Sequence, residues 1–199
     1  MRRVGVTMAR SPVTVRAAGP GDVATIRELW EGALRRAPID EQLTDVATVV
    51  AQSAASDTQA VIVAEHDGQV AGAAFLLCSI MTPLNREPVV LVVAPHVFPS
   101  FQRRGVGTAL MDAAARYAEQ HGIAHLVTAA GADARDSNRF LARLAFSPVA
   151  ILRVAPTATV RAKLGGRRGI AAVRLGGSSS RHIDRVLAAR RGRRERVVG

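Results

Sequence analysis

The sequence predicts an α/β (α+β) protein with a mixed, mostly antiparallel central sheet, one splayed parallel strand pair and flanking helices. Short apolar runs of strand length alternate with amphipathic runs of helical spacing across residues 13–155. Three of the strand-like runs follow one another through short turns, which is typical of an antiparallel meander. A later run follows a long helix too closely for a hairpin, so a parallel or splayed pairing through a crossover is expected.

Length and charge predict one ordinary domain with an appendage. The chain has 199 residues, of which 48% are hydrophobic and 22% are charged, a globular mixture. Residues 157–199 hold twelve of the 27 Lys and Arg residues against two acids, so most of the net charge of +11 lies there. We therefore expect a nearly neutral domain over residues 12–156 and a basic, Arg-rich, partly flexible C-terminal extension over residues 157–199.

The first elements are a strand and two helices. "VTVRAA", from Val13 to Ala18, is typical of a strand, and Asp22 is placed to cap the helix that follows. Pro38 ends that helix and a second helical pattern begins. The first apolar stripe is predicted to comprise Val23, Ile26, Trp30, Ala33 and Leu34. The second stripe is predicted to comprise Ile39, Leu43, Val46 and Val50.

The meander comes next. "AVIVAEHDGQVAGAAFLLCSIM" holds two apolar runs around Asp67-Gly68, a strong hairpin signal, and "PVVLVVAPHVF" is the third run. Cys78, the single cysteine, is expected to be a core thiol, and one cysteine excludes a disulfide within the chain. These runs are shorter than the ~20 residues of a membrane helix, so we expect a soluble, cytoplasmic protein with no membrane partner.

The last elements of the domain alternate between helix and strand. A helical stripe ends before Gly122 and is predicted to comprise Val106, Leu110, Ala113, Ala114, Tyr117 and Ala118. "IAHLVTAA" is then a strand, Asp136 to Ala145 a helix, and "PVAILRVA" another strand. In the extension, "IAAVRL" is a candidate strand between glycine-rich spacers, and a short basic helix is expected from about Ser180.

The glycine-rich start of the long helix is the main candidate site. "QRRGVGTAL" follows the strand ending in "HVFP", which places several backbone N–H groups without intrahelical partners at one point. These donors and the helix dipole favour an anion. Gly105 and Gly107 lack a Cβ, so a phosphate can approach the backbone and the turn can adopt dihedrals closed to other residues, while Arg103 and Arg104 add positive charge. A plain tight turn is the alternative interpretation of this G-x-G.

"HVFPSFQRRGVGTALMDAA" resembles the signature of the GNAT superfamily of acetyl-CoA-dependent N-acyltransferases. The positions that match it are Val97, Pro99, Gln102, Gly105 and Gly107. "RFLARLAF" is similar to a later element of that family, and the resemblance covers roughly Val13 to Ala155. It implies a GNAT-like fold, with acetyl-CoA as cofactor and CoA as product.

The resemblance also implies which residues bind the cofactor. Backbone groups around His96 and Val97 would pair with pantetheine. The pyrophosphate would be held by Arg103, Arg104, Gly105, Val106, Gly107 and Thr108. Gln102 would also belong to the cofactor-binding residues. The family's asparagine position is Ala134, but Asn138, one helical turn later, would project from the same face. Asn138 either contacts CoA or supports the start of its own helix.

The catalytic residues match the family less well. Leu141 occupies the position of the family's tyrosine, so the general acid is unknown, and Ala145 replaces a glycine before Phe146. His96 is the candidate general base because its ordinary pKa range is suitable and it lies beside the cofactor strand. Glu87 and a water are alternatives. His66, His121 and His125 lack metal-ligand spacing with carboxylates, so no metal is expected.

Three functions follow as expectations. The first is transfer of an acetyl group from acetyl-CoA to a primary amine, by direct attack in a ternary complex. The second is a weakly catalytic CoA-binding sensor or scaffold. The third is association of the basic extension with nucleic acid or an acidic partner, by counterion release. Residues near Ala37 to Glu41 and the turn "TPLNREP" are expected to frame the acceptor site. The acceptor stays unidentified, and the oligomeric state is left open, with a homodimer as one alternative.

Overall fold

The structure is a computed structural model, which describes residues 13–131 and 133–165. Its described residues form one five-stranded sheet in the order β1-β2-β3-β4-β5. The strands are β1 (Val13–Ala17), β2 (Gln59–His66), β3 (Gln69–Ile80), β4 (Pro88–Val97) and β5 (His125–Thr128). The first three pairings are antiparallel and the β4–β5 pairing is parallel. The predicted mixed, mostly antiparallel sheet is therefore confirmed.

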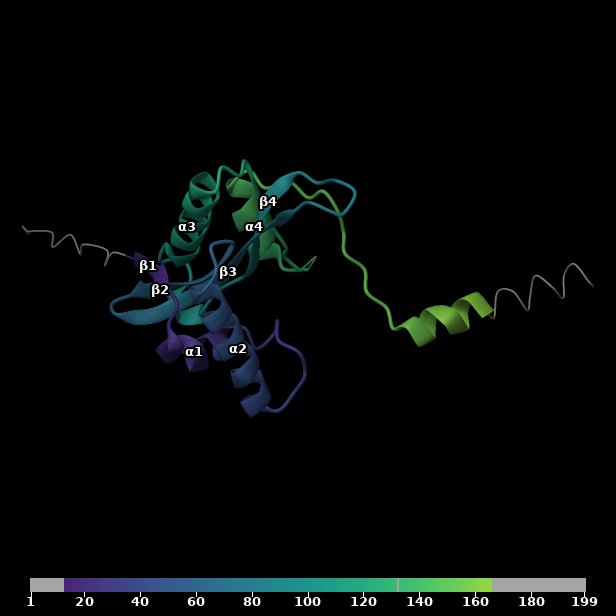
Figure 1. Ribbon diagram of the computed structural model, residues 1–199, viewed down its shortest axis with the longest axis horizontal. Helices are drawn as coiled ribbons and strands as arrows, with labels where there is room; N and C mark the ends of the chain where they lie inside the picture. Colours follow the sequence, from purple (N-terminus) through teal and green to yellow (C-terminus); the bar gives the residue numbers. More distant parts are fainter. Residues whose placement is uncertain (1–12, 132, 166–199) are drawn as a thin grey trace, which may run out of the picture. The chain divides into compact units, whose positions relative to one another are not determined.

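Helices cover both faces of this sheet. The helical elements are η1 (Pro20–Asp22), α1 (Val23–Leu29), α2 (Ile39–Ala54), η2 (Pro99–Phe101), α3 (Val106–Gln120) and α4 (Arg135–Arg143). Figure 1 shows α1 and α2 on one side of the strands and α3 on the other. The chain divides into two compact units, Met1–Arg139 and Phe140–Gly199, so the division falls inside α4.

The core against α1 and α2 is built from side chains that alternate along the strands. Ile26 and Trp30 pack with Val46 of α2 and with Val63 and Ala73 of the sheet. Successive strand residues point to opposite faces, so the neighbours of Val63 and Ala73 face α3. On that face α3 buries Val106, Leu110, Met111, Ala114 and Ala118. The helical stripe predicted for this segment is largely confirmed, with Ala113 and Tyr117 only half-buried.

One glycine sets how closely α3 approaches the sheet. A Cβ on Gly72 in β3 would lie 2.8 Å from the His96 carbonyl oxygen, 3.0 Å from Val106 Cγ1 and 3.2 Å from Leu110 Cδ1. Only a residue without a side chain leaves room for β4 and the first turns of α3 at this distance. Gly72 therefore allows the first turns of α3 to lie close to β3 and β4.

Asp22 differs from its predicted role. Its side chain makes no capping bond to α1. Instead it accepts two hydrogen bonds from the Arg16 guanidinium, at 2.7 and 2.9 Å, and one from the Gly19 N–H at 2.7 Å. The hydrogen bonds from Arg16 hold the pKa of the Asp22 carboxyl below its ordinary value. The carboxylate thus binds Arg16 of β1 and the backbone at the start of η1, and not the start of α1.

The two helical stripes predicted before β2 are partly wrong. α1 ends at Leu29, and the N–H groups of Ala33 and Leu34 both bond to the Trp30 carbonyl oxygen in the tight turn that follows. Ile39 is 61% exposed in the first turn of α2, while Gln42 is buried. Gln42 tolerates burial because its amide is hydrogen-bonded at both ends, to Arg27 and to the Arg35 carbonyl.

The predicted hairpin is confirmed. Asp67 and Gly68, which join β2 to β3, have φ values of 53° and 73°. A type I′ turn requires positive φ at both central residues, and Asp-Gly is among the residue pairs that adopt it readily.

The strand predicted at "PVAILRVA" is wrong. Residues 148–155 contain no strand, and Val149, Ile151, Leu152 and Val154 are 84%, 70%, 91% and 90% exposed. An apolar run becomes a strand only where a neighbour supplies hydrogen-bond partners, and no described residue pairs with this one. Residues 157–165 are helical, although the sequence predicted no helix there. The predictions for "IAAVRL" and for the helix from Ser180 lie outside the described residues.

Candidate functional site

The loop between η2 and α3 contains two residues in the left-handed backbone region. Arg103 and Gly105 both have positive φ, at 60° and 92°. Gly105 is the N-cap of α3, and no side chain makes a capping hydrogen bond there. The first bond of the helix runs from the Ala109 N–H to the Gly105 carbonyl at 2.9 Å. The N–H groups of Val106, Gly107 and Thr108 therefore have no intrahelical acceptor.

Space and charge at this turn suit an anion. No heavy atom lies within 4 Å of where a Cβ on Gly105 would stand, and Gly105 is exposed. Successive N–H groups in such a turn, together with the helix dipole, give a fixed positive potential. Gln102, Arg103 and Arg104 are also exposed beside it. The Arg104 guanidinium lies 5.7 Å from the Phe101 ring centroid, so this charge is stacked on an aromatic face.

The two glycines of the motif have different roles. The unusual dihedral predicted for the turn is confirmed for Gly105. For Gly107 that prediction is wrong, because this residue lies in the first turn of α3 and has no positive φ. Helical backbone is open to any residue, so what Gly107 supplies is the absence of a side chain.

Strands β4 and β5 separate beside this turn. Their parallel pairing runs from Val89 with His125 to Val92 with Thr128 and extends no further. Thr128 Oγ1 donates to the Val92 carbonyl at 2.8 Å and closes the last paired position. The remainder of β4, from Val93 to Val97, pairs with β3 on one edge only. The predicted splay is confirmed, and this stretch presents backbone groups toward the gap.

A bulge in β4 accompanies the separation. The register with β3 shifts between Ala73, which pairs with His96, and Phe75, which pairs with Val93. Ala94 lies in the shift with a φ of 46°. Bulges of this kind bend the strand that carries them and increase its twist. β4 thus changes direction two residues after its last pairing with β5.

The candidate bases lie at opposite ends of β4. His96 pairs with Ala73, which faces the α1 and α2 core, and directly paired residues share a face. His96 is exposed on that face, four positions beyond the last paired position, Val92. Glu87 precedes β4, and its carboxylate lies 3.7 Å from His125 Nδ1. Neither residue lies at the point where the strands part.

The remaining predicted residues lie in α4 or directly after it. The Asn138 side-chain amide donates to the carbonyls of Gly131 at 2.9 Å and Ala134 at 3.0 Å. These bonds support the start of α4, which is one of the two roles expected for Asn138, and they leave its amide oxygen for another donor. Leu141, at the position of the family's tyrosine, is half-buried and offers no proton. Ala145 adopts a φ of 64°, a left-handed conformation that favours glycine.

The single tyrosine lies elsewhere. The Tyr117 hydroxyl donates to the Asp57 carbonyl at 3.3 Å and is 3.9 Å from Cys78 Sγ, itself half-buried. Burial, together with the Cys78 contact, raises the pKa of Tyr117. Tyr117 lies eleven residues after Val106, or ~16 Å along α3, so it does not face the turn at the helix start.

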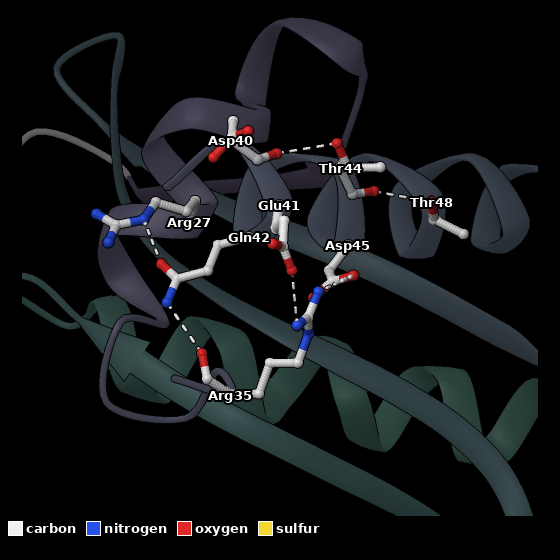
Figure 2. A network of polar contacts seen from close by, with 8 residues as sticks. All are labelled: Arg27, Arg35, Asp40, Glu41, Gln42, Thr44, Asp45 and Thr48. Atoms are coloured by element: carbon white, nitrogen blue, oxygen red, sulfur yellow. Dashed lines mark hydrogen bonds and ion pairs between the residues drawn. The ribbon is translucent and has the colours of Figure 1, made fainter. Parts of the chain in front are cut away.

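A polar network occupies the region between α1 and α2 where an acceptor site was expected. Figure 2 shows Gln42 between Arg27 and Arg35, and Arg35 beside two carboxylates of α2. Arg35 pairs with Glu41 at 2.9 Å and with Asp45 at 2.7 Å. A shallow hollow of about 190 Å³ lies among these side chains. The turn over residues 82–87 is closed by its own hydrogen bonds, which run among Thr82, Asn85 and Glu87.

The described residues lack two further kinds of feature. Within residues 13–131 and 133–165, no group of three His, Cys, Asp or Glu side chains is arranged to hold a metal ion. Among the helices of the same ranges, none is long and apolar enough to cross a membrane.

Comparison with known proteins identifies similar sequences and folds. The family model described as "Acetyltransferase (GNAT) family" matches residues 24–146. Aminoglycoside N-acetyltransferase AAC(6')-Iy in complex with CoA is similar in structure, with a TM-score of 0.62, 21% identity, and coverage of 76% of this chain and 99% of that one. Glucosamine-6-phosphate N-acetyltransferase from Arabidopsis thaliana gives a TM-score of 0.58, 12% identity, and coverage of 73% and 99%.

A third similar structure is the ribosomal-protein-alanine N-acetyltransferase from Brucella melitensis biovar Abortus 2308. It gives a TM-score of 0.56, 16% identity, and coverage of 73% of this chain and 99% of that one. At these identities the structural likeness concerns the fold alone. Among curated proteins, none matches the sequence significantly.

Proposed function

The chain belongs to the GNAT acetyltransferase family, and from that premise we propose that it transfers an acetyl group from acetyl-CoA to a primary amine, by direct attack within a ternary complex. The observation that carries the proposal is the junction of two features. An uncapped helix start with left-handed turns at Arg103 and Gly105 adjoins the parted ends of β4 and β5. A diphosphate followed by an extended amide chain matches that junction in charge and in hydrogen bonding.

The backbone from Arg103 to Thr108 would hold the diphosphate. The open space at Gly105 fits this group, because a side chain there would occupy the cradle. Arg103 and Arg104 would add charge, and Gln102 would contact the same group from its exposed position at the loop start. The N–H groups of Val106, Gly107 and Thr108 would donate directly to phosphate oxygens.

The unpaired edge of β4 would bind the pantetheine arm. Backbone groups around His96 and Val97 would pair with its amides in place of a neighbouring strand. Gly72 keeps α3 close to this edge, so the diphosphate and the arm would be held together. Asn138 would offer its free amide oxygen from α4. Fixing both reactants beside each other supplies much of the rate in a reaction of this kind.

The chemistry requires one proton to move. When bound, acetyl-CoA supplies a thioester whose acyl carbon the amine nitrogen attacks, with cleavage of the carbon–sulfur bond and departure of CoA as thiolate. His96 would accept the proton that the amine loses, either directly or through a water. Leu141 cannot protonate the thiolate, so solvent would do so.

A CoA-binding sensor or scaffold is the second candidate function. The observation that favours it is Leu141, because a missing general acid typically lowers the rate by about 10²–10⁴-fold. The third expectation is that the basic extension binds nucleic acid or an acidic partner. Most residues of this extension lie outside the described ranges.

Calorimetry and a thiol-release assay would test these functions. We expect acetyl-CoA and CoA to bind more tightly than 3′-phosphoadenosine 5′-diphosphate, which keeps the diphosphate and lacks the pantetheine arm. Release of free CoA thiol should depend on an added primary amine. Binding without amine-dependent release across a broad panel would favour the sensor, and equal affinity for all three ligands would contradict the role given to β4.

A further inference from the structure

Trp30 joins the end of α1 to the bulge of β4. Its indole Nε1–H donates to the Ala94 carbonyl oxygen at 2.9 Å, across 64 positions of sequence. The side chain is only 5% exposed and packs in the core beside Ile26. This bond satisfies a carbonyl that the bulge has taken out of the regular ladder.

Ala94 adopts a conformation that alanine disfavours. Its φ of 46° lies in the left-handed region, where a Cβ crowds the following carbonyl. Pro95 follows and has no N–H with which to stabilise the strand. Such a backbone persists only where its surroundings hold it, and the Trp30 bond is a contact that does so.

The backbone of Trp30 is itself anchored. Its N–H bonds to the Ile26 carbonyl at 2.9 Å, and its own carbonyl accepts from Ala33 at 2.7 Å and Leu34 at 3.0 Å. The indole is therefore presented to β4 from a fixed position. Ala94 lies two residues past Val92, where the β4–β5 pairing ends.

We propose that Trp30 is a positioning residue that holds β4 in its bent form, and so keeps open the gap between β4 and β5 that binds the pantetheine arm. The inference rests on the proposed function. Without the indole donor, Ala94 relaxes toward an ordinary strand conformation and the backbone of Val93–Val97 moves within the gap. Affinity for acetyl-CoA then falls, although Trp30 does not touch the ligand.

The test removes the donor while keeping an aromatic ring. Trp30→Phe should weaken acetyl-CoA binding about tenfold by calorimetry. It should also raise the KM for acetyl-CoA more than it lowers kcat. Amide exchange in a peptide covering residues 93–98 should become faster. Ile26→Val, in the same buried cluster, is the matched control for loss of packing, and it should change neither the affinity nor the exchange.

A second variant separates conformation from packing. Glycine adopts positive φ freely, so Ala94→Gly should bind acetyl-CoA nearly as the parent does. Combined with Trp30→Phe, it should recover at least about threefold of the lost affinity. Trp30 is also the single tryptophan of the chain, so acetyl-CoA should alter the intrinsic tryptophan emission of the unmodified protein.

The results for the variants test the role of Trp30, and the result for the parent protein tests the proposed function. If Trp30→Phe matches Ile26→Val in both affinity and exchange, or if exchange rises without loss of affinity, the inference is overturned. A parent protein that fails to bind acetyl-CoA would overturn the proposed function instead. In that event the exchange data alone decide whether Trp30 holds the bulge.

Discussion

The two ends of α3 differ in whether their backbone groups have hydrogen-bond partners. At its start, three N–H groups meet no side-chain cap, and the preceding turn includes Arg103 in a left-handed conformation. At its end, the N–H of Gly122 bonds to the Glu119 carbonyl and that of Ile123 to the Ala118 carbonyl. The His121 ring adds bonds to the carbonyls of Tyr117 and Asp57. A helix end that serves only the fold is closed by the chain itself, whereas an end left open has its donors available for a ligand.

Equal backbone strain at the two ends of α3 should affect ligand binding at only one of them. Gly105, with a φ of 92°, and Gly122, with a φ of 65°, both lie in the left-handed region with no neighbour within 4 Å of an added Cβ. Valine at either position should lower the free energy of unfolding by about 1–2 kcal/mol. Only Gly105→Val should weaken acetyl-CoA binding, by about 30-fold or about 2 kcal/mol in calorimetry.

Gly122→Val is the internal control for that experiment. It carries the same kind of backbone strain on the same helix, so it should retain the parent affinity. Equal losses of affinity in the two variants would mean that the start of α3 has no special role in binding.

Crowding the start of α3 should have the next largest effect. In Gly72→Ala, the new Cβ meets the His96 carbonyl oxygen and Val106, so β4 and α3 must move apart. We expect a loss of about 1–2 kcal/mol in unfolding free energy and an affinity for acetyl-CoA about tenfold lower. Denaturant titration and calorimetry would measure the two. Gly32→Ala, where an added Cβ meets nothing within 4 Å, should leave both unchanged.

The end of α4 lacks the glycine that usually follows a helix. Ala145 follows α4 with a φ of 64°, nearly the same as Gly122 after α3. Ala145→Gly should therefore raise the free energy of unfolding by about 0.5–1 kcal/mol. Denaturant unfolding would measure the gain. Ala142→Gly, inside α4, should do the reverse because glycine weakens a helix interior. A destabilised Ala145→Gly would argue against a left-handed Ala145.

The smallest effect concerns the closed end and depends on pH. Both His121 ring nitrogens lie near carbonyl oxygens, at 2.8 Å from Tyr117 and 2.6 Å from Asp57, and carbonyls only accept. The Tyr117 bond, with the Asp57 bond, raises the pKa of His121. The folded state thus favours the protonated ring, and this contribution is full below the ordinary pKa of about 6.5 and is lost as pH rises through the folded value.

His121→Gln should accordingly lower the melting temperature by about 1–2 °C at pH 5.5 and leave it almost unchanged at pH 8.5. Differential scanning calorimetry across this range would detect the trend. The affinity for acetyl-CoA should stay at the parent value at both pH values. A difference that grows with pH would show that the sign is wrong.

Local patterns carried most of the fold prediction. The Asp67-Gly68 turn, the amphipathic run from Val106 and the three consecutive strands follow from spacing and turn chemistry, and all are present. Asp22 shows the limit of such reasoning, because a carboxylate that suits a helix cap also suits Arg16 on a strand. "PVAILRVA" shows another limit, since β-propensity does not reveal whether a partner strand exists.

The candidate site was predictable only in part. The positive φ of Gly105 follows from a glycine at the junction of loop and helix. A glycine within a strand marks a close backbone approach, so Gly72 carried a signal that the sequence reasoning missed. The Trp30–Ala94 bond had no such signal, because it joins residues 64 positions apart through a bulge in a run of ordinary apolar residues.

The order of strands in the sheet has a consequence for how the chain assembles. β2, β3 and β4 are joined by short hairpins, so their contacts close small loops and can form early. β1 pairs Val13 with His66 and Ala17 with Ile62, so these contacts close a long loop that contains α1 and α2. The strand made first is therefore expected to dock late, and Arg16, through its ion pairs with Asp22 and Glu65, would secure that final step.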